Sequence, residues 1–110
     1  DGGFLYNPIP QSLGVSRDAN LPIMIVIFNN GEYRAMKNNQ LSYYPDGVGK
    51  QSDIFLGATI NAVEYSQMVE PFGGYGQRVE DPAELDAALE AGLKAVKEGR
   101  TAIINVIVSH

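Results

Sequence analysis

Residues at two points of the chain have the types needed to hold a metal ion and a phosphate. Asp1 is followed by Gly2 and Gly3, and Asn29-Asn30-Gly31 comes directly after the apolar run of residues 23–28. Carboxylate and amide oxygens are ligands that a hard divalent cation such as Mg²⁺ prefers. Glycines let main-chain N–H groups approach a phosphate without a Cβ in the way. The two points are therefore expected to be halves of one site.

The spacing of the two points predicts how they meet. Residues 3–28 separate Gly2 from Asn29, which is enough for one helix and one strand, the length of a right-handed crossover unit. In open α/β sheets, ligands bind outside the carboxyl ends of the strands. Asn30 follows such a strand end, and the carbonyl of Glu32 can supply a third oxygen. The helix after Asp1 can add its positive N-terminal end to an anion site.

The first half of the chain predicts one helix, one strand and a second helix. Residues 2–6 are expected to form a loop and residues 10–19 a helix with Leu13 and Val15 as its apolar positions. Residues 21–28 are continuously apolar and rich in β-branched side chains, which favours a strand buried on both faces of a parallel sheet. Residues 32–41 are expected to be helical, and residues 42–51 a loop around the turn Pro45-Asp46-Gly47.

The second half of the chain carries clearer signals for its helices and strands. Residues 63–70 are expected to be helical and residues 75–79 a short strand, and the glycines at 73–76 indicate a helix stop and turn rather than a nucleotide-binding loop. Asp81, Pro82 and Glu84 predict a capped helix start. The apolar face of that helix is assigned to Leu85, Leu89, Leu93 and Val96, before a strand at residues 102–108. Helices alternating with apolar strands predict an α/β fold with a mainly parallel sheet flanked by helices.

Composition limits the classes of function. The chain has 110 residues, 45% hydrophobic and 19% charged, which is one domain or a piece of one. Its net charge of −5, without a basic cluster, argues against nucleic acid and anionic membrane surfaces. No apolar run approaches the roughly 20 residues that span a bilayer. The absence of cysteine rules out disulfides and thiolate metal sites and fits the expected cytoplasmic location.

The two halves of the site also resemble a known motif. Asp1-Gly2-Gly3, followed after a helix and an apolar strand by Asn29-Asn30, is similar to the Gly-Asp-Gly and Asn-Asn diphosphate-binding motif of thiamine diphosphate enzymes. The leading Gly of that motif is missing because the sequence starts at Asp1. Residues 72–76, 78–85 and 102–106 resemble the acetolactate synthase and benzoylformate decarboxylase branch. The resemblance is vaguest over residues 38–60.

The resemblance implies the cofactors thiamine diphosphate and Mg²⁺. By position, Asp1 and Asn30 would bind Mg²⁺ through their side chains and Glu32 through its backbone oxygen. Asn30 is also placed among the residues that bind the cofactor. The family's cofactor supplies the carbanion chemistry, while the protein contributes orientation and charge.

Five further residues are given roles by the same resemblance. Gly2 and Gly3 would contact the diphosphate through the backbone, and Tyr33 would lie near the diphosphate or the mouth of the site. Many relatives have Ser where this chain has Gly3, so a hydroxyl contact is expected to be missing. Ala35 and Met36 fall where some relatives line the substrate pocket.

The resemblance places the family's acid–base machinery outside this chain. The glutamate that protonates the aminopyrimidine ring comes from a separate pyrimidine-binding domain, usually of a partner subunit, so none of Glu32, Glu64, Glu70 or Glu80 is assigned that role. Residues 1–110 are therefore expected to be the C-terminal part of the diphosphate-binding domain, with upstream strands and the pyrimidine-binding domain outside it. No catalytic residue is expected in this chain, and it is not expected to bind cofactor or fold well alone.

The expected reaction is C–C bond cleavage or formation on a 2-oxo acid. An acetolactate-synthase-like decarboxylation with carboligation is the first choice, and a benzoylformate-decarboxylase-like lyase is the alternative. A non-catalytic scaffold or regulatory fragment of the same fold is a third reading. The implied partners are the remainder of the enzyme, in a homodimer or homotetramer, and a small 2-oxo acid.

Overall fold

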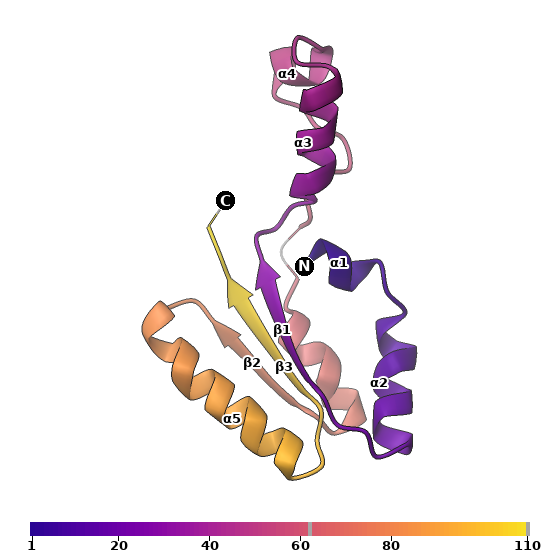
Figure 1. The fold of residues 1–110 in the computed structure, drawn as a ribbon, viewed down its shortest axis with the longest axis vertical. Helices are drawn as coiled ribbons and strands as arrows, with labels where there is room; N and C mark the ends of the chain where they lie inside the picture. Colours follow the sequence, from indigo (N-terminus) through magenta and orange to yellow (C-terminus); the bar gives the residue numbers. More distant parts are fainter. Residues whose placement is uncertain (62, 110) are drawn as a thin grey trace. The chain divides into compact units, whose positions relative to one another are not determined.

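The computed structural model describes residues 1–61 and 63–109, which divide into two compact units. The first unit holds Asp1, Gly3–Asn30 and the chain from Glu64 onward, and the second holds Gly2 and Gly31–Val63. The first unit contains a parallel sheet of three strands in the order β1-β3-β2 (Figure 1). This confirms the predicted α/β fold with a parallel sheet. Within the described residues, no helix is long and apolar enough to cross a membrane.

The central strand of the sheet is the last in sequence. β3 (Ala102–Ile107) pairs with β1 (Met24–Asn29) on one edge and with β2 (Tyr75–Val79) on the other. Five of its six residues are buried because strands flank both of its edges and helices cover both faces. β1 begins later than predicted: the N–H of Ile23 donates to the Thr101 hydroxyl, and the ladder starts after it. Because the strands are parallel, the carboxyl ends of all three lie at the same end of the sheet, and ligands bind outside that end in such sheets.

One face of the sheet is covered by α2 (Ile9–Asp18) and the 3₁₀ helix η1 (Tyr65–Phe72). The buried side chains on this face come from both helices and from two strands: Leu13, Ile27, Tyr65, Val69 and Ile103. Val15, predicted as an apolar position of the first long helix, is instead 63% exposed. It lies two residues from Leu13, which places it on the opposite side of a helix.

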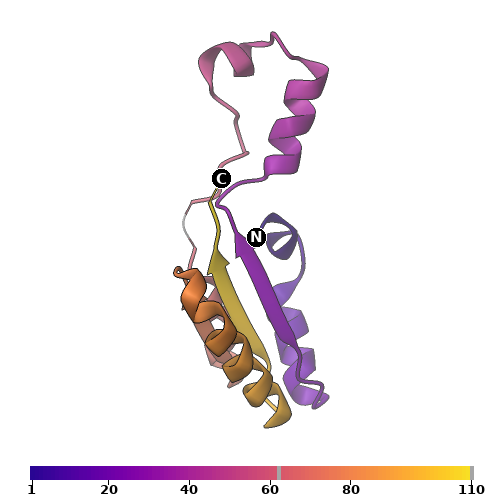
Figure 2. The same ribbon diagram turned by 60° about the vertical axis from the view of Figure 1, so that its left-hand side comes forward.

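The other face is covered by α5 (Leu85–Lys97), preceded by the short 3₁₀ turn η2 (Pro82–Glu84). Figure 2 shows α2 and α5 on opposite sides of the sheet. The predicted leucine face was only partly right, since the fully buried positions are the small residues Ala88, Gly92 and Ala95, whereas Leu93 is 44% exposed. A Cβ on Gly92 would lie 3.0 Å from the Met24 sulfur. The helix therefore packs on the sheet through its small residues because they allow a close approach.

The second unit is built around α3 (Arg34–Tyr43) and α4 (Val48–Ser52). Its two ends are joined by an antiparallel bridge between Glu32 and Thr59, and the Lys37 ammonium lies 4.9 Å from the centre of the Phe55 ring. The predicted helix at residues 32–41 is confirmed with a shift of two residues. The loop predicted at residues 42–51 was partly wrong, because α4 begins inside it.

Two other local predictions differ from the structure. Residues 2–6 were expected to be a loop, but Gly2–Leu5 form one helical turn, α1. Residues 63–70 were expected to be an ordinary helix, but Tyr65–Phe72 form a 3₁₀ helix with Pro71 inside it. Proline lacks the N–H that a continuing helix needs, and Gly73 ends the element with φ of 73°.

The cap at the start of η2, the turn that leads directly into α5, carries a first prediction. The Asp81 carboxylate accepts a hydrogen bond from the Ala83 N–H at 2.9 Å, as the sequence predicted for an N-cap. Replacing Asp81 with Ala should destabilise the helix start by about 1 kcal/mol, whereas Asp81→Ser should retain most of the capping. Hydrogen exchange of the α5 amides in the intact protein measures this difference. Equal exchange in both variants would contradict a capping role.

Candidate functional site

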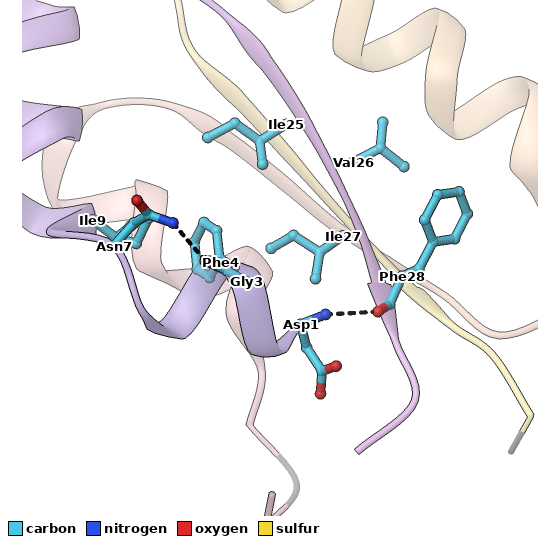
Figure 3. Close-up of a pocket in the computed structure, with 9 residues that line it drawn as sticks. All are labelled: Asp1, Gly3, Phe4, Asn7, Ile9, Ile25, Val26, Ile27 and Phe28. Carbon is cyan, nitrogen blue, oxygen red and sulfur yellow. Dashed lines mark hydrogen bonds between the residues drawn. The ribbon is translucent and has the colours of Figure 1, made fainter. Parts of the chain in front are cut away.

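Asp1 lies beside the carboxyl end of β1. Its amino group donates a hydrogen bond to the Phe28 carbonyl at 2.8 Å (Figure 3). Successive carbonyls of a strand point to opposite edges, and the Asn29 carbonyl accepts from the Val108 N–H on the β3 side. The Phe28 carbonyl, and Asp1 with it, is therefore on the outer edge of β1.

The strand end itself provides the amides. Asn29 is the last residue of β1 and is 9% exposed, and half-buried Asn30 follows it within the same unit. The predicted pairing of the two chain regions is supported to this extent: Asp1 is held one residue from Asn29-Asn30. Coordination of a metal by Asp1 and Asn30 stays a prediction.

The helical turn α1 presents main-chain donors next to Asp1. The first hydrogen bond of this turn runs from the Leu5 N–H to the Asp1 carbonyl at 3.1 Å. The N–H groups of Gly2, Gly3 and Phe4 precede that bond, so the helix does not use them internally. A Cβ placed on Gly3 would have no atom within 4 Å, so this side of Gly3 is open. Such a donor set fits a phosphate group.

In the second unit, Gly2 and Tyr33 lie against each other. A Cβ on Gly2 would be 2.7 Å from the Tyr33 ring, so a larger residue at this position would require the ring to move. Tyr33 is the residue that precedes α3, and its N–H donates to the Ala58 carbonyl at 2.7 Å. Gly2 and Tyr33 therefore lie side by side, while the predicted contact of each with a cofactor stays a prediction.

Glu32 was predicted to act through its backbone oxygen, and its side chain is already engaged. The carboxylate accepts from the Arg34 Nε at 2.6 Å and is 16% exposed. The main-chain bonds of the bridge to Thr59 involve the Gly31 carbonyl and the Tyr33 N–H. Coordination of a metal by the Glu32 carbonyl stays a prediction.

The two residues assigned to a substrate pocket lie on α3. Both Ala35 and Met36 are exposed, with Met36 at 53%. Their role stays a prediction, because the relatives' pockets are expected to be completed by other parts of the protein.

An open pocket of about 430 Å³ runs along the outer edge of β1 (Figure 3). Ile25 and Ile27 line it from one side of the strand, and Val26 and Phe28 project from the other side. Its remaining lining residues come from the chain start: Asp1, Gly3, Phe4, Asn7 and Ile9. The pocket therefore wraps a strand edge whose side chains are mainly apolar.

A polar cluster that sequence reasoning did not find is centred on Glu64. Its Oε1 accepts from the Ser66 hydroxyl at 2.6 Å, the Ser66 N–H at 3.1 Å and the Asn105 Nδ2 at 3.1 Å, and its Oε2 from Arg78 at 3.1 Å. Arg78 also binds Glu80 at 2.6 Å. The one available signal was Asn105, a polar residue inside an otherwise apolar strand.

The charges of this cluster reinforce one another. Burial alone would raise the pKa of Glu64, but the hydrogen bonds from Ser66, Asn105 and Arg78 outweigh it, so the pKa lies below the ordinary value. The hydrogen bonds to Glu80 and Glu64 raise the pKa of Arg78. Both groups are therefore charged at neutral pH.

The described residues contain no cluster of three or more His, Cys, Asp or Glu side chains suited to a metal. The predicted set is of a different kind, with one carboxylate, one amide and one main-chain carbonyl. All three are oxygen donors, which suits Mg²⁺ when a bound phosphate supplies further oxygens. The chemistry of the donors and the open side of Gly3 therefore fit a metal–diphosphate group.

Comparison with known proteins shows similarity along nearly the whole chain. The family described as "Thiamine pyrophosphate enzyme, C-terminal TPP binding domain" matches residues 1–106. An acetolactate synthase of Bacillus subtilis (strain 168) is 34% identical over 110 residues, covering 100% of this chain and 17% of that protein. A 2-hydroxyacyl-CoA lyase of Oryza sativa subsp. japonica is 35% identical over 92 residues, covering 80% of this chain and 14% of the relative.

A third relative, a probable acetolactate synthase large subunit of Methanococcus aeolicus, is 29% identical over 93 residues, covering 84% of this chain and 14% of its own length. The chain thus spans 14% to 17% of these relatives. The match to the family covers nearly all of the chain and includes both halves of the site. The chain therefore belongs to the family of the C-terminal TPP-binding domain of thiamine pyrophosphate enzymes.

Proposed function

We propose that this chain supplies the diphosphate- and Mg²⁺-binding half of a thiamine diphosphate site in an enzyme that breaks or forms C–C bonds of a 2-oxo acid. The observation that carries the proposal is the hydrogen bond from the Asp1 amino group to the Phe28 carbonyl, because it brings the only carboxylate of the predicted metal set to the end of β1. Membership in the TPP-binding family supports the same cofactor.

Within this class, an acetolactate-synthase-like decarboxylation with carboligation is the favoured reaction. Two of the three relatives named above are called acetolactate synthase or its probable large subunit. The third is called a lyase, which supports a 2-oxo acid decarboxylase, of the benzoylformate decarboxylase kind, as the second candidate.

Each residue of the proposed site has a defined task. Asp1 and Asn30 hold Mg²⁺ through side-chain oxygens, and Glu32 holds it through its carbonyl. The N–H groups of Gly2 and Gly3 bind diphosphate oxygens, and Tyr33 closes the site near them. When bound, thiamine diphosphate supplies the carbanion chemistry at the substrate carbonyl. Ala35 and Met36 contribute to the substrate pocket.

The remainder of the enzyme is proposed to supply the acid–base glutamate and the strand beside β1. Among the described residues, β1 pairs only with β3, so the outer main-chain groups of Met24 and Val26 face no strand. Such an edge is normally paired or covered in a native protein. A pyrimidine-binding domain, usually of a second subunit, would complete the cofactor site in a homodimer or homotetramer.

Calorimetric titration of the intact protein with thiamine diphosphate and Mg²⁺ tests the proposed function. We expect saturable heat only when both are present, because Asp1, Asn30 and Glu32 would hold Mg²⁺ and a bound phosphate would supply its further oxygens. Incubating the loaded protein with pyruvate then separates the reactions: acetolactate indicates carboligation, and acetaldehyde indicates simple decarboxylation. Absence of binding heat would favour the scaffold reading and overturn the proposal.

A further inference from the structure

The carboxylate of Glu64 joins three separate elements of the sheet unit. It caps η1 through the Ser66 N–H, and it also binds Arg78 on β2 and Asn105 on β3 at 3.1 Å each. Capping η1 would need only the first of these bonds. The two cross-strand bonds show that the carboxylate also fixes the start of η1 to the sheet.

Asn105 depends on this carboxylate. Its side chain is 0% exposed in the central strand, and its Nδ2 donates to Glu64. Within the part of the chain that the structure describes, its Oδ1 has no hydrogen-bond partner. Burying an amide is costly unless it is hydrogen-bonded, so removing the Glu64 acceptor would leave the whole amide group without compensation.

Glu64 is the first residue of the sheet unit after the Gly31–Val63 segment. The chain leaves the sheet unit after Asn30 and returns to it at Glu64. The intervening segment, Gly31–Val63, contains Glu32 and Tyr33 of the proposed site. Glu64, where the chain re-enters the sheet unit, is therefore hydrogen-bonded to side chains on β2 and β3 that are distant from it in sequence.

We propose that Glu64 is an ionic latch, a positioning residue that fixes the point at which the chain returns from the Gly31–Val63 segment to the sheet. The latch consists of Glu64 with Ser66, Asn105 and Arg78. It needs the negative charge, because Arg78 and Asn105 both donate to the carboxylate and a neutral amide could not accept equally from both sides. This role is separate from cofactor binding and holds whether or not a cofactor is bound.

The latch has a defined pH dependence. The charged groups facing Glu64 are Arg78 on β2 and, through Arg78, Glu80, while its partner on β3 is the neutral Asn105. Because the Glu64 pKa is lowered in the folded state, the latch contributes stability above the ordinary glutamate pKa. That contribution is lost as the pH falls through the lowered pKa of Glu64.

Hydrogen exchange of the intact protein without cofactor tests the latch. In the Glu64→Gln variant, amides of residues 64–67 should exchange about 10- to 100-fold faster, as expected for lost charge-assisted hydrogen bonds. The α5 amides should be unchanged, which shows that the variant is folded. Asn105→Leu, which leaves the capping of η1 intact, should also speed exchange at residues 64–67.

Glu80→Gln is the matched control, because it removes the other carboxylate bound to Arg78 and leaves Ser66 and Asn105 in place. It should exchange like the wild type at residues 64–67. After correction for intrinsic rates, the wild type and Glu80→Gln should both show an acid transition at these amides that Glu64→Gln lacks. Unchanged exchange in Glu64→Gln, or an effect of Glu64→Gln without one of Asn105→Leu, would overturn the latch.

A second measurement rests on the proposed function. If the Gly31–Val63 segment presents Glu32 and Tyr33 to the cofactor, Glu64→Gln should raise the KM for thiamine diphosphate about 10-fold and leave kcat at saturating cofactor unchanged. The exchange experiment requires no cofactor, so failure of the proposed function and failure of the latch give different results. A fall in kcat at unchanged KM would contradict the positioning role.

Discussion

Replacing Asp1 with Asn in the intact protein is expected to weaken Mg²⁺ binding at least about 100-fold, since changing even the groups that support metal ligands costs 10- to 100-fold. The substitution preserves the size of the side chain and removes its charge. Asp1 supplies the only carboxylate side chain of the proposed metal set, whose other members are neutral oxygens. Titration of cofactor-dependent activity with Mg²⁺ at saturating thiamine diphosphate gives the apparent affinity.

Asp18→Asn is the control for this change. Asp18 belongs to the same unit, and its side chain is 69% exposed and paired with Arg17 on the surface. The Asp18→Asn substitution removes the same charge at a position far in sequence from the proposed ligands. It should leave the Mg²⁺ affinity within about two-fold of the wild-type value, as expected for a surface ion pair. Equal Mg²⁺ affinity in the wild type and Asp1→Asn would remove Asp1 from the metal site.

The sheet was predictable because its strands carry strong local signals. The apolar run of residues 21–28 and the run around Ile103 are both typical of strands in a parallel sheet. β3 is buried on both faces as predicted, but for β1 this part of the prediction was wrong within the described residues, because Phe28 is 64% exposed. Tyr75–Val79 was found at its observed bounds, because Gly73 and Asp81 mark its two sides. The parallel order follows because helical segments separate the strands.

The packing on the sheet was less predictable, because it depends on distances between elements. The spacing of Leu89 and Leu93 suggested a buried leucine face for α5. The structure instead turns Ala88, Gly92 and Ala95 toward the sheet, since small side chains let the helix approach Met24 and Ile104 closely. A periodic pattern shows that a helix is amphipathic but not which of two neighbouring stripes gives the closest packing.

The candidate site was likewise predictable only in the parts that depend on local sequence signals. The residue types of Asp1 and Asn30 and their spacing predict a metal–phosphate site from the sequence alone. The Glu64 cluster could not be inferred, because Arg78 and Asn105 are brought to Glu64 only by the pairing of β2 and β3. Residues that are brought together by strand pairing have no characteristic spacing in the sequence, so such a cluster cannot be predicted from it.

Replacing Gly76 with Ala is expected to destabilise the sheet unit by about 3 kcal/mol, the upper end of the range for overpacking a core. Gly76 lies in β2, and a Cβ there would overlap the Ser66 carbonyl oxygen at the start of η1. A main-chain atom cannot rotate away as a side chain can, so η1 and β2 would have to move apart. The thermal unfolding midpoint and the hydrogen exchange of β2 amides in the intact protein measure the loss.

Gly14→Ala provides the comparison. A Cβ on Gly14 would lie 3.7 Å from the Phe72 ring, an ordinary contact, and alanine favours the α2 helix by roughly 0.5–1 kcal/mol. This variant should match or slightly exceed the wild type in stability. The glycine-rich stretch at residues 73–76 would then have two physical roles: Gly73 ends η1 in the left-handed conformation, and Gly76 makes room for a neighbouring backbone. A stable Gly76→Ala protein with unchanged β2 exchange would show that η1 is not packed this closely on β2.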